Sequence, residues 1–311
     1  MMRILRLGFL LLFIPLTHMC LAQDNSGLVD VNSMPIISGK STLAPTNDIQ
    51  HHGGPVISTP QGVNVYVIWY GDWSSSSDTA AQSIVTEFIR NLGGSTYFNI
   101  NTTYFDYSNK QIDPVRNRVN YIGSTTDNYS RGTALSNQDV GDIVVQTIAS
   151  GKFPLDQNGA YFVITSADVD ETSGFCTTYC AWHGFDRLTK NGFMQLDAFV
   201  GNPDRCPSGC AFQPHLPTPN NNVAGDAMVN LIAHELSETV TDPFGNAWYA
   251  SAGAVGNENA DLCVWTFGQT TTLKNGSIAN VTLDDRNYLL QRIWVNALGG
   301  YCSLSWVNGA Q

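Results

Sequence analysis

Val63-Asn-Val-Tyr-Val-Ile-Trp-Tyr70 is the segment that indicates the fold class most clearly. It is a nearly continuous run of β-branched and aromatic residues, which is typical of a strand buried on both faces. Asp78 then predicts the start of a helix over residues 79–92, and Gly93-Gly94 predicts its end. A buried strand followed at once by a helix indicates an α/β arrangement.

The remaining chain continues this alternation. We expect strands at 118–122, 160–165 and 194–200, helices from Asn137 or Asp139 to Ser150 and from Asp226 to Val240, and a strand or a helix at 288–295. The pattern predicts an α/β fold, with one mixed β-sheet flanked by helices. Residues 59–311 contain no break in composition, so we expect one domain there. Residues 23–58 are rich in Ser, Asn, Pro and Gly, which predicts a flexible N-terminal segment.

The first 22 residues have the features of a secretory signal peptide. Arg3 and Arg6 precede the apolar run 7–16, and Cys20-Leu21-Ala22 supplies small residues before a cleavage point. The apolar run is too short to span a bilayer, and no other segment approaches the necessary length. The sequence therefore predicts a secreted protein without a membrane span.

Composition narrows the classes of partner. The chain of 311 residues has a formal net charge of −11, which argues against binding to nucleic acid or to an anionic membrane surface. Only 13% of the residues are charged and 43% are hydrophobic, so the chain can bury a sizeable core. We expect an extracellular or cell-wall component of unknown identity as the partner.

Six cysteines remain after removal of the signal peptide: Cys176, Cys180, Cys206, Cys210, Cys263 and Cys302. An even number in an exported chain indicates disulfides. Two C-x3-C pairs could each close locally, because residues one helical turn apart lie within disulfide range, about 6 Å between Cα atoms. We expect the pairs 176–180, 206–210 and 263–302. The alternative is a zinc site made of four cysteines.

Four Asn-x-Ser/Thr tripeptides predict glycosylated surface loops in a secreted protein. They begin at Asn101, Asn128, Asn275 and Asn280.

Several local motifs occur in the order found in one plant family. They are His52-Gly53-Gly54-Pro55 before the first strand, Gly174-Phe175-Cys176 with Cys180 and His183-Gly184, Cys206-Pro207 with Cys210-Ala211 and His215, and 239–245 (TVTDPFG). Together they resemble the EXORDIUM or phosphate-induced protein family over about residues 51–302. The resemblance implies a secreted protein of the apoplast or cell wall that is linked to growth and cell expansion. It supplies no catalytic residues.

The residues most suggestive of chemistry are 234–238 (HELSE), inside the last predicted helix. His234 and Glu238 are four residues apart, so their side chains leave the same face of the helix one turn apart. Two ligands fixed in this way, with an open position for water, suit a catalytic metal, and Glu235 beside them could accept a proton. The motif resembles the H-E-x-x-H of zincin metalloproteases, with glutamate in place of the second histidine.

The zincin resemblance also implies a third ligand. Glu258 follows 20 residues after Glu238 in an Asn-Glu context similar to that of thermolysin-type enzymes. Asp242 and Asp261 are alternatives for this role. A carboxylate in place of imidazole makes the site harder and less selective for zinc over calcium or manganese. The order of strands and helices also resembles the upper domain of a zincin.

Two functions therefore remain open. One is a growth-associated extracellular or cell-wall protein, with or without a divalent-metal site. The other is a secreted zinc-dependent hydrolase with His234 and Glu238 as ligands and Glu235 as the base. The chain contains no G-x-S-x-G elbow, P-loop or dinucleotide fingerprint, which removes the usual support for other enzyme classes. His183 and His215, each after a C-x3-C pair, fit hydrogen-bonded structural positions better than ligand positions. Asp197 stands on an otherwise apolar strand, where an edge position would satisfy it.

Overall fold

The computed structural model describes residues 32–37, 49–107, 111–188, 193–251, 253 and 256–307. The predicted signal peptide lies outside this part of the chain. The strands are β1 Asn32–Pro35, β2 Gln50–His51, β3 Val63–Tyr70, β4 Phe105–Asp106, β5 Asp113–Pro114, β6 Val119–Asp127, β7 Ala134–Leu135, β8 Gly159–Thr165, β9 Asp170–Glu171, β10 Tyr179–Leu188, β11 Phe193–Val200, β12 Trp248–Tyr249, β13 Thr271–Thr272, β14 Ile278–Ala279, β15 Val281–Leu283, β16 Arg286–Tyr288, β17 Ile293–Val295 and β18 Tyr301–Ser303. The helices are α1 Ser76–Leu92, α2 Asn137–Ala149, α3 Pro207–Cys210 and α4 Val223–Thr241, with 3₁₀ turns η1 Phe98–Thr103, η2 Pro203–Arg205 and η3 Asp261–Cys263.

The main sheet has the strand order β1-β10-β11-β8-β3-β6. Strands β11, β8, β3 and β6 run parallel, whereas β1, β10 and β11 pair antiparallel. The predicted mixed α/β sheet is therefore confirmed. Every residue of β8 and almost every residue of β3 is buried, because helices cover both faces of this parallel region.

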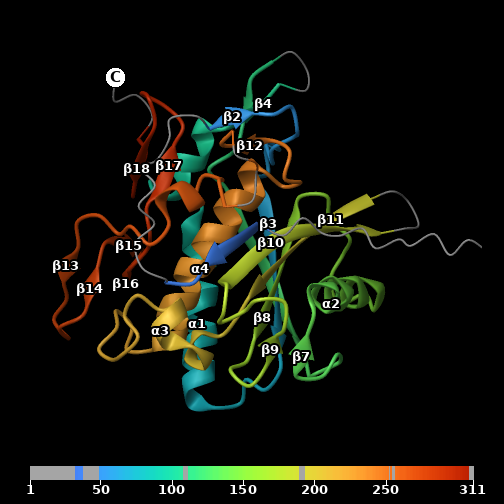
Figure 1. The fold of residues 1–311 in the computed structure, drawn as a ribbon, viewed down its shortest axis with the longest axis vertical. Helices are drawn as coiled ribbons and strands as arrows, with labels where there is room; N and C mark the ends of the chain where they lie inside the picture. The colour runs from blue at the N-terminus through green and yellow to red at the C-terminus, as the bar shows by residue number, and fades with distance from the viewer. Residues whose placement is uncertain are drawn as a thin grey trace, which may run out of the picture.

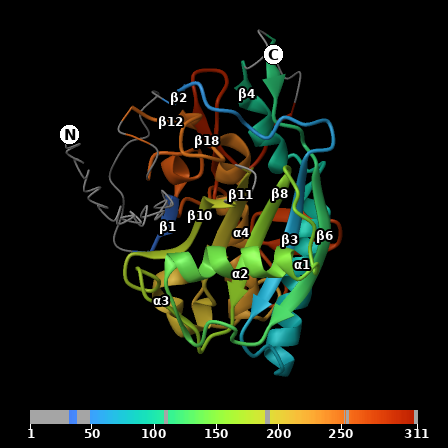
Figure 2. The same cartoon turned by 90° about the vertical axis from the view of Figure 1, so that its right-hand side faces the viewer.

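Helices α1 and α4 pack side by side on one face of the sheet, and α2 covers the opposite face (Figures 1 and 2). The sequence determines where α1 and α2 begin. Ser75 and Ser136 each accept a hydrogen bond from the backbone N–H three residues on, and the aspartate at that position bonds back to the serine N–H. These two capping boxes satisfy backbone groups that would otherwise lack partners. The buried faces of the helices join one hydrophobic core with the sheet.

Two parts of the N-terminal segment that was predicted to be flexible form strands. Residues 32–35 form β1 at the edge of the main sheet, and residues 50–51 form β2, which pairs with β12. Ile49 and Val56 are buried in the core. Composition did not reveal this order, because the strands are short and their partners lie more than 100 residues away in the sequence.

The disulfides differ in part from the predicted pairing. Cys263–Cys302 is confirmed, but the other two bridges are Cys176–Cys206 and Cys180–Cys210. The Sγ atoms of Cys206 and Cys210 do lie close together, 3.6 Å apart, because α3 places them on one turn. Each nevertheless bonds to a cysteine of the other motif, since Cys180 lies in the extended strand β10 while Cys176 lies in the preceding turn. Two neighbouring bridges thus tie this turn to α3, and the four-cysteine zinc alternative is wrong.

Candidate metal centre

Helix α4 carries the predicted metal-binding motif into the interior of the protein. Asn222 caps the helix, and its side-chain oxygen accepts a hydrogen bond from the backbone N–H of Gly225. Residues 227–241 are almost all buried, because α4 lies between α1 and the strands β10 and β11. His234, Glu235 and Glu238 are each 0% exposed. A histidine and two carboxyls at such positions must find compensating charge or hydrogen bonds within the protein.

The predicted helical pair does form. Nε2 of His234 lies 3.1 Å from Oε1 of Glu238, and it also lies 3.4 Å from Oδ1 of Asp261. Neither contact has the geometry of a hydrogen bond, since Nε2 of His234 and Oδ1 of Asp261 both lack a hydrogen-bond partner. His234, Glu235 and Glu238 place one potential ligand atom each within 4.8 Å of one another.

The acidic residues that follow α4 come from a turn around η3. The backbone N–H of Asp261 donates to Oε1 of Glu238 at 3.0 Å, and that of Glu258 donates to Oδ2 of Asp261 at 3.2 Å. The turn is therefore hydrogen-bonded directly to the side chain of Glu238. As a result, Glu238 and Asp261 keep fixed relative positions.

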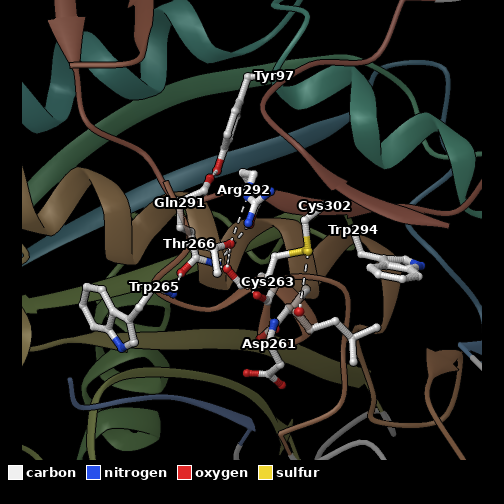
Figure 3. The surroundings of a disulfide bond; sticks show 12 residues. Tyr97, Asp261, Cys263, Trp265, Thr266, Gln291, Arg292, Trp294 and Cys302 are labelled. Atoms are coloured by element: carbon white, nitrogen blue, oxygen red, sulfur yellow. Dashed lines mark hydrogen bonds between the residues drawn. A yellow bond between two sulfur atoms is a disulfide. The ribbon is translucent and has the colours of Figure 1, made fainter. Parts of the chain in front are cut away.

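The Cys263–Cys302 disulfide anchors this turn to the C-terminal hairpin of β17 and β18 (Figure 3). The side chain of Gln291 donates to the carbonyl of Ala260, and the backbone N–H of Trp294 donates to the carbonyl of Asn259. Tyr97 in turn donates to the carbonyl of Gln291. These contacts fix the backbone on both sides of Asp261.

His183 on β10 belongs to the same cluster, although we predicted a purely structural role for it. Its Nε2 lies 3.2 Å from Oε2 of Glu258 and 3.6 Å from Oε2 of Glu238. His183, Glu238 and Glu258 form a second group whose potential ligand atoms lie within 4.8 Å of one another. Glu258 thus meets Glu238 beside His183 rather than beside His234. Among the predicted third ligands, Asp261 is the one that approaches His234.

Asp242 caps the end of α4, where it neighbours Glu258 and belongs to the same acidic cluster. Oδ1 of Asp242 accepts the backbone N–H groups of Asn246 and Ala247, at 2.7 and 2.6 Å, and so closes the turn after α4. Burial raises the pKa of Asp242 to about 6. His215 is exposed.

Burial shapes the electrostatics of the cluster. It raises the pKa values of Glu235, Glu238 and Glu258, and neighbouring carboxylates add to each increase. Burial works to lower the pKa of His234, but the carboxylates of Glu238 and Asp261 outweigh it and hold that pKa well above its ordinary value. Burial lowers the pKa of His183 to about 4, although Glu238 opposes this.

Several buried atoms of the cluster have no hydrogen-bond partner among the described residues. They are Nδ1 of both histidines, Nε2 of His234 and one carboxyl oxygen each of Glu235, Glu238, Asp242, Glu258 and Asp261. Buried polar atoms in folded proteins are almost always satisfied, so a group of orphaned donors and acceptors requires an explanation. A divalent cation would engage such oxygens and imidazole nitrogens directly.

Asp197 lies elsewhere, on the face of the sheet that α2 covers. It is 1% exposed, and neither carboxyl oxygen has a hydrogen-bond partner. It occupies β11 between β10 and β8, so the predicted edge-strand position is wrong. Burial, reinforced by the charge of Asp186, raises its pKa to about 8.

The predicted glycosylation sites differ in accessibility. Asn128 and Asn275 are exposed, whereas Asn101 is 1% exposed and hydrogen-bonds to Ser237 and Asn259. A glycan on Asn101 has no room in this structure. Asn280 is half-buried and donates its amide hydrogens to two backbone carbonyls, those of Phe267 and Leu290. Glycosylation at the exposed positions stays a prediction.

The fold and the cluster define an α/β protein that buries a histidine–carboxylate centre under the edge of its sheet. The chain belongs to the phosphate-induced protein 1 family, because the model of that conserved region matches residues 49–302. It is 30% identical over 285 residues to Protein EXORDIUM-like 3 of Arabidopsis thaliana, covering 82% of each chain. It is 29% identical over 298 residues to Protein EXORDIUM-like 5 of the same plant, covering 84% of this chain and 80% of the relative.

A further relative is Protein PHOSPHATE-INDUCED 1 of Nicotiana tabacum, which is 28% identical over 246 residues and aligns with 70% of this chain and 73% of its own length. No solved structure matches the chain. None of the helices in the described ranges is both long and apolar enough to cross a membrane.

Proposed function

We propose that this chain is a secreted protein of the plant apoplast, linked to growth and cell expansion, that holds one divalent metal ion and acts as a metal-dependent hydrolase. Family membership supports the growth-associated role. Three disulfides support the extracellular location, since such bonds form and persist mainly in oxidising compartments. The observation that carries the chemistry is the orphaned Nε2 of His234, held 3.1 Å from Oε1 of Glu238 in the core.

The ligands we propose are His234, Glu238 and Asp261. This set offers one imidazole nitrogen and carboxylate oxygens, a donor set that zinc accepts. His183 then acts from outside the set, because it lies near the other oxygen of Glu238 and hydrogen-bonds with Glu258. Partners of this kind orient the ligands of metal sites. The competing set is His183, Glu238 and Glu258, which shares only Glu238 with the first.

Glu235 is the residue we assign as general base. It follows His234 directly, and one of its oxygens has no partner among the described residues. A bound divalent ion would polarise a substrate carbonyl and make a nearby water more acidic. Glu235 would accept a proton from that water and pass it to the leaving group. A base in this role contributes about 10²- to 10⁴-fold to the rate.

Elemental analysis of the purified secreted chain, equilibrated with micromolar zinc, tests the ligand set. We expect about one equivalent of zinc in the wild type and none in His234→Ala. The matched control is His215→Ala, which removes an exposed histidine and should keep the metal. Loss of zinc in His183→Ala with retention in His234→Ala would instead assign the competing set. A wild-type chain that stays metal-free would refute the metal centre.

Glu235→Gln separates an enzyme from a binding protein. The substitution keeps the shape of the side chain and removes its ability to take a proton. A hydrolase should keep its zinc and lose its growth-promoting activity, whereas a protein that acts only by binding should keep both.

A further inference from the structure

The edge of the main sheet beside the candidate centre is occupied by β1. This strand pairs antiparallel with β10, in a register that places Asn32 opposite His183 and Met34 opposite Ala181 (Figure 2). Met34 is fully buried. Beyond the strand, Ile36 and Ile37 donate backbone hydrogen bonds to the carbonyls of Thr178 and Gly209. An N-terminal segment, distant in sequence from β10, thus forms the edge strand of the sheet next to the cluster.

The backbone of β1 contacts the proposed base directly. The N–H of Met34 donates to Oε1 of Glu235 at 3.3 Å, which leaves only the second oxygen of that carboxyl without a partner. The peptide bond between residues 33 and 34 therefore lies within hydrogen-bond distance of the residue that would move the proton. Glu235 is 0% exposed with β1 in place.

β1 lies outside the conserved region of the family, which begins at residue 49. The part of the chain that the family model covers therefore supplies β10 but not its neighbour at this edge. A strand edge without a neighbour presents unpaired N–H and C=O groups that can pair with another extended chain. Here the unpaired groups would belong to residues 179–183, ending at His183.

We propose that β1 is a built-in inhibitory strand that occupies the position of an extended peptide substrate on the edge of β10. This inference rests on the proposed function, and it adds the substrate class and its regulation. A peptide that replaced β1 in the same register would place one of its amide nitrogens where the N–H of Met34 lies now. Only displacement of β1 frees Glu235 for such a peptide.

The hydrolysis of a peptide bound in this way is balanced without a further reagent. The water oxygen forms a bond with the carbonyl carbon as the C–N bond breaks. Glu235 takes one proton from the water and delivers it to the leaving nitrogen, at the position now held by the nitrogen of Met34. The products are a carboxylic acid and an amine.

A site-specific protease sequence inserted after Lys40, in the full secreted chain loaded with zinc, provides the test. Three quantities are measured before and after cutting: binding of a fluorescent peptide with the sequence of residues 31–37, hydrolysis of quenched fluorescent casein, and zinc content. We expect cutting to raise peptide affinity and casein hydrolysis about tenfold or more, because apparent affinity scales with the fraction of open sites.

Two point variants give the same test without cutting. Met34→Pro removes the N–H that bonds to Glu235 and should reproduce the increase. Pro35→Ala, the matched control at the neighbouring position, keeps the N–H of Met34 and should behave as the uncut wild type. These two variants keep the test valid if the strand stays on β10 after cutting, because they act on β1 without a cut.

Zinc content in the same samples separates the two proposals. If Met34→Pro and the cut chain retain zinc but gain neither peptide binding nor hydrolysis, the inhibitory strand is refuted and the metal centre stands. If they gain peptide binding but hold no zinc, strand exchange on β10 is supported and the metal centre is refuted.

Discussion

Asp197→Asn should change how the stability of the protein depends on pH. The carboxyl is buried on β11, neither of its oxygens is hydrogen-bonded, and Asp186 of β10 adds negative charge. Gln138 of the neighbouring helix α2 donates hydrogen bonds to both Asp186 and Asp142. Arg131, which precedes α2, pairs with Asp142 at 3.0 Å. No cation contacts Asp197 directly within the described part of the chain. The folded protein therefore favours its neutral form.

The direction and size of the effect follow from the pKa of about 8 in the folded state against the ordinary value of 3.8. Between these values the folded state keeps a proton that the unfolded state has lost, so stability falls as the pH rises. Each pH unit in this window costs about 1.4 kcal/mol, so the fall between pH 5 and pH 8 is on the order of 4 kcal/mol. Below pH 3.8 Asp197 is protonated in both states, so its raised pKa costs no stability. Above pH 8 it is ionised in both states, so the loss of stability no longer changes with pH.

Urea unfolding at pH 5 and at pH 8.5 measures this effect. Asparagine stays neutral at both, so the stability of Asp197→Asn relative to wild type should rise by on the order of 4 kcal/mol from the lower to the higher pH. Asp285→Asn, which removes an exposed carboxylate, controls for the loss of one charge. An equal difference in stability between Asp197→Asn and wild type at the two pH values would show that Asp197 does not hold a proton in the folded state.

Three further predictions concern the scaffold. Replacing Cys263 and Cys302 by alanine should lower the free energy of unfolding in urea by about 4 kcal/mol, since the bridge closes a loop of sequence separation 39. The same change should weaken zinc binding, because it loosens the turn that carries Asp261. Unchanged zinc affinity would show that the hydrogen bonds alone hold this turn. Ser75→Ala should cost about 1 kcal/mol by removing the cap of α1, with Ser74→Ala as a control, and an unchanged unfolding midpoint would contradict the cap. Peptide mapping of the secreted protein should find no glycan on Asn101, because it is buried, and an occupied Asn101 would contradict its placement.

The sequence predicted the elements whose signal is local. Residues 63–70 were predicted as a strand with the bounds it has, because a buried parallel strand is apolar at nearly every position. The helix over 226–240 was also predicted, and its true start at Val223 lies three residues earlier, where Asn222 caps it. In both cases the residues that determine the element lie within it or directly beside it.

Features that depend on distant contacts escaped prediction. Strand β10 was not predicted, because Gly184 and Asp186 interrupt its apolar residues. Without this strand the position of His183 could not be predicted either. In a strand, residues 181, 183 and 185 lie on one face. This alternation is the signal from which the orientation of His183 towards α4 could have been predicted. The disulfide pairing depends on how the turn at 174–180 packs against α3, which spacing alone does not encode.

The most direct test of the metal centre is a crystal structure of the zinc-loaded chain, with anomalous data collected at the zinc edge. We expect one anomalous peak at about 2.0–2.2 Å from Nε2 of His234 and from carboxylate oxygens of Glu238 and Asp261. A peak between His183 and Glu258, or the absence of any peak in the core, would contradict it.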